Sequence, residues 1–330
     1  MPPGEFIWSP AKHFLFRNCP RAWFFRYYLA QGGWNVLSAD PAMHAYLLKY
    51  LSTVDSWMSS AAEESLTGAL QEIMSFSGPG RSEVLTEAFQ VRVSTHLIRA
   101  RDDLVHREYL TDPKRVSFQE LYYETGEYRS ESELLFMIQN RFRDFFQAWE
   151  ESDLAAELAA VDPLSWRLPP EHRIFPYAGY RISLRPWIYA VQRHRVTAWL
   201  FSFAYSRGEE TPDFLNDPEE YGLPERVLAA WCVRKYPEFQ VCVRKVLLTP
   251  EGLVNRSVFP VPVSEDFVMR SADEMLREAN HPAGLKAENY ARPENPEICS
   301  RCRFRELCGT LPFPAAEPEP CGESDRQDEN

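Results

Sequence analysis

The chain has 330 residues, of which 45% are hydrophobic and 14% aromatic, and a formal net charge of −12. This composition is typical of a folded protein with a large core, and it excludes an intrinsically disordered chain. The acidic balance argues against a protein that coats nucleic acid without specificity. No apolar run is long enough to cross a bilayer, and seven cysteines without a signal peptide indicate a reducing compartment. We therefore expect a cytoplasmic protein without a membrane partner.

The first half of the chain is predicted to be mainly helical. Its apolar residues recur with helical spacing, most clearly in SESELLFMIQNRFRDFFQAWEE. The segment SGPGRS is typical of a turn, and its Ser82 is expected to cap the helix that follows. The helices are expected at 10–31, 40–53, 57–75, 82–101 and 130–151.

The second half is predicted to mix strands and helices. Pro224 lies near the first turn of one expected helix, and Ser264 or Asp266 begins another. Strands are expected at 172–177, 180–191, 194–205, 239–248 and 253–261, the last two as a hairpin around Thr249–Gly252, and helices at 222–236 and 264–279.

This order of elements predicts an α/β fold with a helical insertion. We expect one domain over 1–315, in which about 32–155 is the insertion, about 170–280 the core and 297–310 a cysteine cluster. Residues 316–330 hold six acids and one arginine, so this tail is expected to be disordered.

The cysteines carry the strongest chemical signal. Cys299, Cys302 and Cys308 form a C-x2-C-x5-C run, which is one ligand short of a tetrahedral sulfur site for Zn(II) or an iron–sulfur cluster. Cys19 could supply the fourth ligand and so fasten one end of the chain to the other. The C-x2-C pair, Cys299 and Cys302, could also be a redox dithiol or two unrelated buried thiols. Cys232 and Cys242 lie in apolar stretches typical of core residues.

The N-terminal segment WSPAKHFLFRNCPRAWFFRYY and the three late cysteines resemble the RecB-like branch of the PD-(D/E)XK nucleases. More narrowly, the chain resembles the four-cysteine iron–sulfur exonucleases of CRISPR adaptation and helicase–nuclease repair. The similarity spans residues 6–310 and includes RARDDLVHREYLTDPKRVSFQELYYETG. It implies a restriction-endonuclease-like core with a mixed central sheet, and a 4Fe–4S cluster held by Cys19, Cys299, Cys302 and Cys308, with Zn as the alternative.

The catalytic residues of these nucleases are missing from the matching positions. Glu63 stands where the family has a histidine, Trp187 and Leu200 where it has acids, and Ser202 where it has a lysine. Val227 and Trp231 replace a glutamine–tyrosine pair. Hydrolysis of this kind needs carboxylates that hold Mg²⁺ or Mn²⁺, so we expect no catalytic metal and a pseudo-nuclease.

Such a protein is expected to act as a scaffold or nucleic-acid-binding subunit, with a protein partner in a DNA repair or defence assembly. The alternatives are an active exonuclease with relocated ligands, for which Glu63, Glu120 and Glu124 are candidates, and a protein that uses the cluster for redox or iron sensing. Arg17 and Arg21 lie one helical turn apart and are expected to share a face. The expected phosphate contacts are Arg17, Arg21, Arg26, Arg301, Arg303 and Arg305, with Arg181, Arg185, Arg193 and Arg195 as a second basic group.

Overall fold

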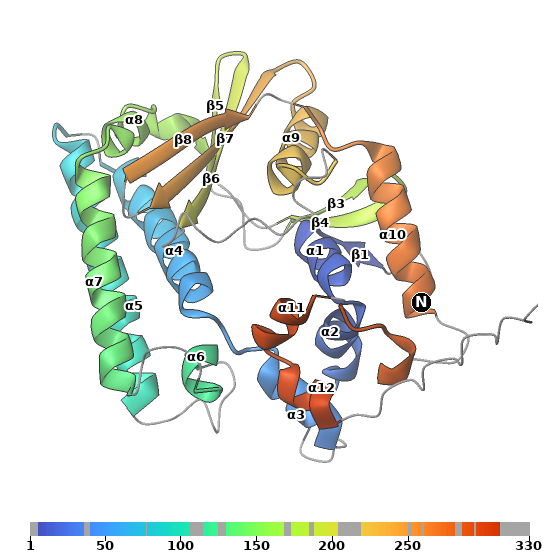
Figure 1. The fold of residues 1–330 in the computed structure, drawn as a ribbon. Coiled ribbons are helices and arrows are strands. Elements are labelled where there is room, and N and C mark those ends of the chain that lie inside the picture. The colour runs from blue at the N-terminus through green and yellow to red at the C-terminus, as the bar shows by residue number, and fades with distance from the viewer. Residues whose placement is uncertain are drawn as a thin grey trace, which may run out of the picture.

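Helices and two β-sheets build the chain, which confirms the α/β class (Figure 1). The computed structural model describes residues 6–35, 40–76, 78–105, 115–124, 130–167, 173–184, 188–203, 219–249, 252–258, 261–280, 286–293 and 295–310. In these ranges no helix is both long and apolar enough to cross a membrane. The acidic tail at 316–330 lies outside them.

The helices have the following bounds. They are α1 (Pro10–Asn18), α2 (Pro20–Phe24), the π-helical turn η2 (Phe25–Leu29), α3 (Asp40–Leu48), α4 (Val54–Met74), α5 (Arg81–Val105), α6 (Gln119–Tyr122), α7 (Glu131–Glu150), α8 (Leu154–Ala159), α9 (Leu223–Lys235), α10 (Glu265–Ala279), α11 (Pro296–Ser300) and α12 (Arg305–Thr310), with the short 3₁₀ turns η4 (Pro163–Ser165) and η6 (Ala287–Asn289).

The strands form a small sheet and a larger one. The small sheet has the order β1-β4-β3, and the larger one has the order β2-β5-β6-β7-β8, in which only β6 and β7 are parallel neighbours. The strands are β1 (Ile7–Trp8), β2 (Trp166–Arg167), β3 (Arg173–Tyr177), β4 (Tyr180–Leu184), β5 (Ile188–Gln192), β6 (Arg195–Phe203), β7 (Gln240–Thr249) and β8 (Gly252–Val258).

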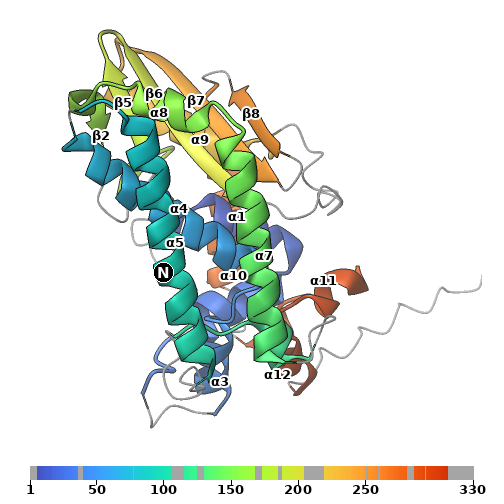
Figure 2. The same ribbon diagram turned by 90° about the vertical axis from the view of Figure 1, so that its left-hand side faces the viewer.

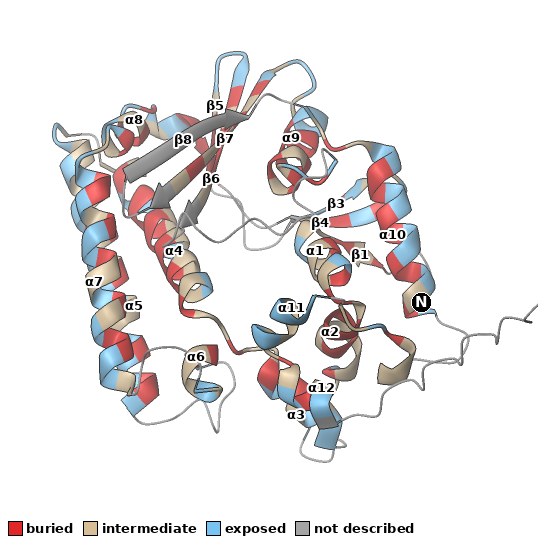
Figure 3. Cartoon of the chain, in the orientation of Figure 1, coloured by how far each residue is buried: buried red, intermediate tan, exposed pale blue. Residues whose placement is uncertain are grey.

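The five-stranded sheet separates two hydrophobic cores. Because side chains alternate along a strand, Trp199 packs with α4, α5 and α7 on one face, whereas its neighbour Leu200 packs with α9 and the N-terminal helices on the other. Helices α4, α5 and α7 lie together on their side of the sheet (Figure 2). Buried and exposed positions alternate along α5 and α7, as one covered face per helix requires (Figure 3).

The expected helix at 10–31 is interrupted at Cys19. This residue has an extended backbone (φ −161°, ψ 99°), because the ring of Pro20 disfavours the helical region for the residue before it. The chain therefore ends α1 and restarts as α2 with Pro20 in its first turn. Ser82 was expected to cap α5 but lies inside its first turn, because the helix begins at Arg81, directly after Gly80, whose φ is +78°.

The expected strand at 180–191 is divided between the two sheets. β4 pairs with β1 and β3, and only β5 pairs with β6, as a hairpin with a tight turn at Arg193 and His194. The predicted hairpin around Thr249–Gly252 is confirmed by the pairing of β7 with β8. Of the two predicted starts of the helix to Ala279, Ser264 is the N-cap, since its hydroxyl accepts a hydrogen bond from Phe267 N.

Candidate functional site: a four-cysteine cavity and its basic border

The Cys-Pro break places the first thiol. In the break, Cys19 is the N-cap of α2, and its Sγ accepts a hydrogen bond from Ala22 N at 3.3 Å. The side chain is 7% exposed and packs in the core on the α9 side of the sheet.

The three late thiols lie on α11, on the turn after it and on α12. Asn295 caps α11 by accepting a hydrogen bond from Glu297 N. The turn is anchored by Phe304 and Leu307, which are 1% and 2% exposed in the same core as Cys19. The Sγ of Cys302 accepts a hydrogen bond from Phe304 N at 3.4 Å.

Cys19, Cys299, Cys302 and Cys308 line one cavity of about 100 Å³. The cavity lies where α2 meets α11 and α12, so the two ends of the described chain come together there (Figure 1). The other lining residues are Ala22, Phe25, Arg292, Pro293, Ile298, Phe304, Arg305 and Gly309, with no acid among them.

Burial makes the bare thiolates unfavourable. It raises the pKa of the Cys302 thiol to about 12, and it raises the pKa of the Cys19 thiol as well. Without a metal these thiols therefore stay protonated at neutral pH. A bound metal favours the thiolate strongly enough to reverse this, so metal binding here would release protons.

The donor set suits a soft metal, but the thiols surround a space and do not meet at a point. Within the described ranges, no three His, Cys, Asp or Glu side chains are arranged to hold a single metal ion. A lone Zn²⁺ would require four sulfurs about 2.3 Å from one centre. Four thiolates are also the usual ligands of iron–sulfur clusters.

The arginines expected to share a face are separated by the break at Cys19. Arg17 is half exposed on α1, where its Nε lies 3.3 Å from Glu220 Oε1. Arg21 on α2 is 1% exposed and donates from Nε to the carbonyl of Tyr290 at 2.9 Å. Arg21 is therefore inaccessible to a phosphate, and the expected Arg17–Arg21 surface is absent.

A second cavity, of about 380 Å³, borders the cysteines and is lined by Arg26, Arg301 and Arg303. Burial, with Arg26 as the next cause, lowers the pKa of Arg303 to about 10 and also lowers the pKa of Lys49. These cations therefore lie close enough to repel one another. Among the described residues, neither Arg26 nor Lys49 forms an ion pair with a carboxylate.

Aromatic rings flank Lys49 beside this group of cations. Lys49 Nζ lies 4.4 Å from the ring centroid of Tyr46 and 5.0 Å from that of Tyr50, and Trp34, which is 68% exposed, packs edge-on against Tyr46. Lys49 and these rings were missed by the sequence analysis. The signal was the spacing in AYLLKY, which puts Lys49 one helical turn after Tyr46 and directly before Tyr50.

The other expected phosphate contacts have different environments. Arg305 stacks on Tyr123 at 3.9 Å and donates to the carbonyl of Ser300. Arg301 is exposed beside the second cavity. Arg181, Arg193 and Arg195 are also exposed, on the strands and turn of the two sheets, and Arg185 lies outside the described residues.

The positions expected to correspond to nuclease catalytic residues are largely apolar. Leu200 on β6 is 7% exposed, and Val227 and Trp231 on α9 are 0% and 6% exposed in the same core. Ser202 follows on β6 opposite Leu247, and Trp187 lies outside the described residues. Glu63 lies on α4, which packs on the opposite face of the sheet from Leu200.

An ion pair between a buried glutamate and a partly exposed lysine occupies this region. Leu200 is in register with Lys245 on β7, and Lys245 Nζ lies 3.0 Å from Oε1 of Glu225, which is 1% exposed on α9. The carboxylate is therefore engaged by an ammonium group. Glu120 is also engaged, because its Oε1 accepts a hydrogen bond from Val54 N at 2.9 Å.

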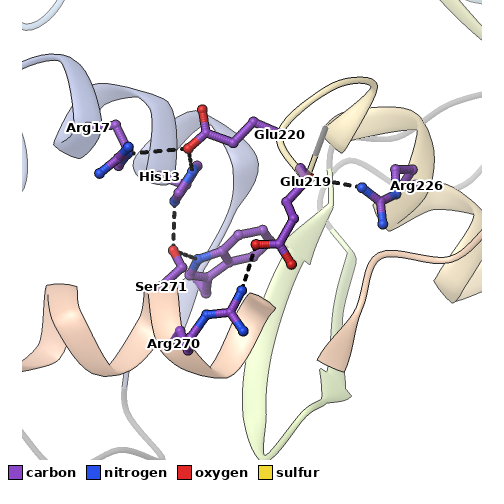
Figure 4. Close-up of polar contacts among 8 residues, drawn as sticks. His13, Arg17, Glu219, Glu220, Arg226, Arg270 and Ser271 are labelled. Carbon is purple, nitrogen blue, oxygen red and sulfur yellow. Dashed lines mark hydrogen bonds and ion pairs between the residues drawn. The ribbon is translucent and has the colours of Figure 1, made fainter. Parts of the chain in front are cut away.

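A polar network at the far end of α1 was also missed by the sequence analysis. His13 Nδ1 lies 2.7 Å from Ser271 Oγ, and His13 Nε2 lies 3.0 Å from Glu220 Oε1, so the imidazole joins α1 to α10 and to the turn before α9 (Figure 4). Trp8 Nε1 donates to the same serine at 2.8 Å. The histidine, serine and glutamate are all at least nine-tenths buried, and they line a cavity of about 190 Å³.

No protein-family model matches the chain, and neither does any curated protein. Among solved structures, the one titled "Crystal structure of SSO0001" aligns with 13% sequence identity over 74% of this chain and 95% of that chain, at a TM-score of 0.30. A likeness of this size carries no conclusion about fold or function.

Proposed function

We propose that the chain is a non-catalytic member of the RecB-like PD-(D/E)XK nucleases, with an iron–sulfur cluster held by Cys19, Cys299, Cys302 and Cys308. The observation that carries this proposal is the single cavity that the four cysteines line from opposite ends of the chain. The cluster would join α2 to α11 and α12 and so stabilise the core on the α9 side of the sheet. The cluster would have a structural role or an electron-transfer role.

The absence of catalysis is proposed from the region around Leu200. A hard cation needs several oxygen ligands, and here the strand position is apolar while the neighbouring Glu225 is paired with Lys245. Val227 and Trp231 complete an apolar packing against the strand. We therefore propose that this region stabilises the fold and leaves phosphodiester bonds intact.

Nucleic-acid binding is proposed for the border of the cysteine cavity. Arg26, Lys49 and Arg303 supply positive charge for phosphates, and Trp34 with Tyr50 supplies rings on which bases can stack. Cations interleaved with aromatic rings favour single strands, whose unpaired bases are free to stack. The proposed role is a nucleic-acid-binding subunit of a DNA repair or defence assembly, with a protein partner.

Metal analysis tests the first part of the proposal. Protein purified without oxygen should contain iron and acid-labile sulfide, and a Cys19→Ser variant should lose most of both. Zinc in place of iron would support the four-cysteine site but contradict the cluster. Absence of any metal from unmodified protein, after reconstitution with iron and sulfide, would refute the proposal.

Binding and cleavage assays test the second part. An Arg26→Gln/Lys49→Gln variant should bind a single-stranded oligonucleotide more weakly than the unmodified protein at low salt, and the difference should shrink at high salt. Arg143→Gln, an exposed change on the outer side of α7, is the matched control. Equal binding by both variants would show that Arg26 and Lys49 do not contact the nucleic acid, and no binding by the unmodified protein at low salt would leave a protein scaffold without nucleic acid. Mn²⁺-dependent cleavage by the unmodified protein would contradict the loss of catalysis.

A further inference from the structure

Arg21 is a buried cation directed at the cysteine cavity. Its side chain is 1% exposed, and its Nη1 lies 4.0 Å from Cys308 Sγ. A guanidinium group keeps its charge at every relevant pH. Burying such a charge costs several kcal/mol unless an opposite charge lies close to it. A thiolate at Cys308 would place a negative charge 4.0 Å from the guanidinium.

A rigid support fixes the direction of the guanidinium. Arg21 Nε donates to the carbonyl of Tyr290, which is itself 1% exposed. The Tyr290 ring stacks on Phe24 with centroids 4.7 Å apart, and its hydroxyl donates to the carbonyl of Glu278 on α10 at 2.9 Å. Arg21 Nε is therefore held by Tyr290, which follows η6 and is bonded to α10, while Nη1 faces the sulfur.

The charges around the cavity fit an anionic occupant. Arg292 and Arg305 line it, Arg21 lies behind Cys308, and no acid is among the lining residues. Four thiolates bound to an iron–sulfur core leave a net negative charge, which increases when the cluster is reduced. A fixed positive charge nearby therefore favours both retention of the cluster and its reduction.

We infer that Arg21 is the built-in counter-ion of the cysteine-bound cluster, and that it raises the reduction potential and slows cluster loss. This inference rests on the proposed function. It assigns Arg21 a positioning and electrostatic role at the cluster in place of the phosphate contact expected from the sequence.

The test compares Arg21→Gln and Arg21→Lys with the unmodified protein, and Arg143→Gln serves as a control that removes an exposed arginine far from the cavity. Each protein is reconstituted with iron and sulfide, and its midpoint potential and its rate of iron loss to a chelator are measured. Arg21→Gln should shift the potential to a more negative value and lose iron faster. Arg21→Lys keeps the charge but loses the hydrogen bond from Nε. Its potential and its rate of iron loss should lie between those of the unmodified protein and of Arg21→Gln. An Arg21→Gln protein with unchanged potential and unchanged iron loss would overturn the inference.

A double-mutant cycle covers the case in which Arg21→Gln folds poorly. Replacing Cys308 by Ser removes the thiolate that faces Arg21, so Arg21→Gln should then destabilise the protein less in urea than it does in the unmodified background. Equal destabilisation in both backgrounds would also overturn the inference. If the unmodified protein holds no metal, the proposed function fails. If it holds iron and Arg21 has no effect, only the role of Arg21 fails.

Discussion

Leu200 is an apolar residue at the strand position on which the proposed loss of catalysis depends. The proposed relation to nucleases would place a metal-binding acid at this position, whereas the leucine side chain is 7% exposed in a core shared with Val227 and Trp231. The adjacent Lys245 is directed to Glu225. An acid at position 200 would enter an apolar environment that already contains a paired carboxylate.

Leu200→Asp should therefore lower the free energy of unfolding by about 2–4 kcal/mol, because burial of the leucine is lost and a carboxylate is desolvated. It should not create Mn²⁺-dependent cleavage. Urea unfolding measures the first effect, and Leu200→Met, which should cost less than about 1.5 kcal/mol, is the control. Nuclease activity in Leu200→Asp would show that the metal site is nearly intact.

The break between α1 and α2 is the element on which the cysteine cavity depends. The aromatic pattern predicts one helix over 10–31, but Pro20 restricts the backbone of the residue before it. That rule alone locates the break. The rule does not predict that Arg21 becomes buried while Arg17 stays half exposed. The burial of Arg21 depends on its packing against Tyr290.

Pro20→Ala should reduce metal retention, because Cys19 becomes free to adopt helical backbone angles that turn its thiol away from the cavity. The loss of proline should also lower the free energy of unfolding by roughly 0.5–1 kcal/mol, because the unfolded chain gains conformational freedom. Metal per chain after dialysis measures the first effect. Pro10→Ala, at the matching position of α1, should cost a similar amount of stability without loss of metal.

The network around His13 fastens the other end of α1. Burial lowers the pKa of His13 below its ordinary value of 6.5, although Glu220 and the more distant Glu274 act to raise it, and Arg17 lowers it further. As the pH falls below about 6.5, the unfolded chain takes up a proton that the folded imidazole resists. His13 therefore contributes to a loss of stability on acidification that begins near this pH and ends below the folded pKa.

His13→Gln should consequently flatten the dependence of unfolding free energy on pH between about 7 and 5. Its stability at pH 7 should be lower, because Ser271 and Glu220 lose their shared partner. The pKa of His96 on α5 is also lowered by burial, so a His96→Gln variant shows how much of the slope belongs to the other core. A slope that is unchanged in His13→Gln would mean that His13 titrates normally in the folded protein.

At the scale of the whole molecule, local patterns predicted most elements but not their grouping. The apolar face of α7 and the β7–β8 hairpin follow from periodicity and turn chemistry, and both are observed. The division of 180–191 between two sheets depends on long-range pairing of β4 with β1, at a sequence separation of more than a hundred residues. The grouping of Lys49 with arginine and aromatic side chains likewise arises only when α3, η2 and the cysteine run pack together.

The two cores lead to a last prediction about metal removal. Cys19 belongs to the core on the α9 side and Cys302 and Cys308 border it, whereas α4, α5 and α7 pack on the opposite face without these cysteines. Because metal binding is coupled to folding, a chelator should first loosen 6–35 and 286–310 and leave the helices of the other core protected. Hydrogen exchange read by mass spectrometry would show faster exchange in those two segments and little change in α4, α5 and α7. Uniform loss of protection across both cores would mean that the cysteine cavity stabilises the entire fold as one cooperative unit.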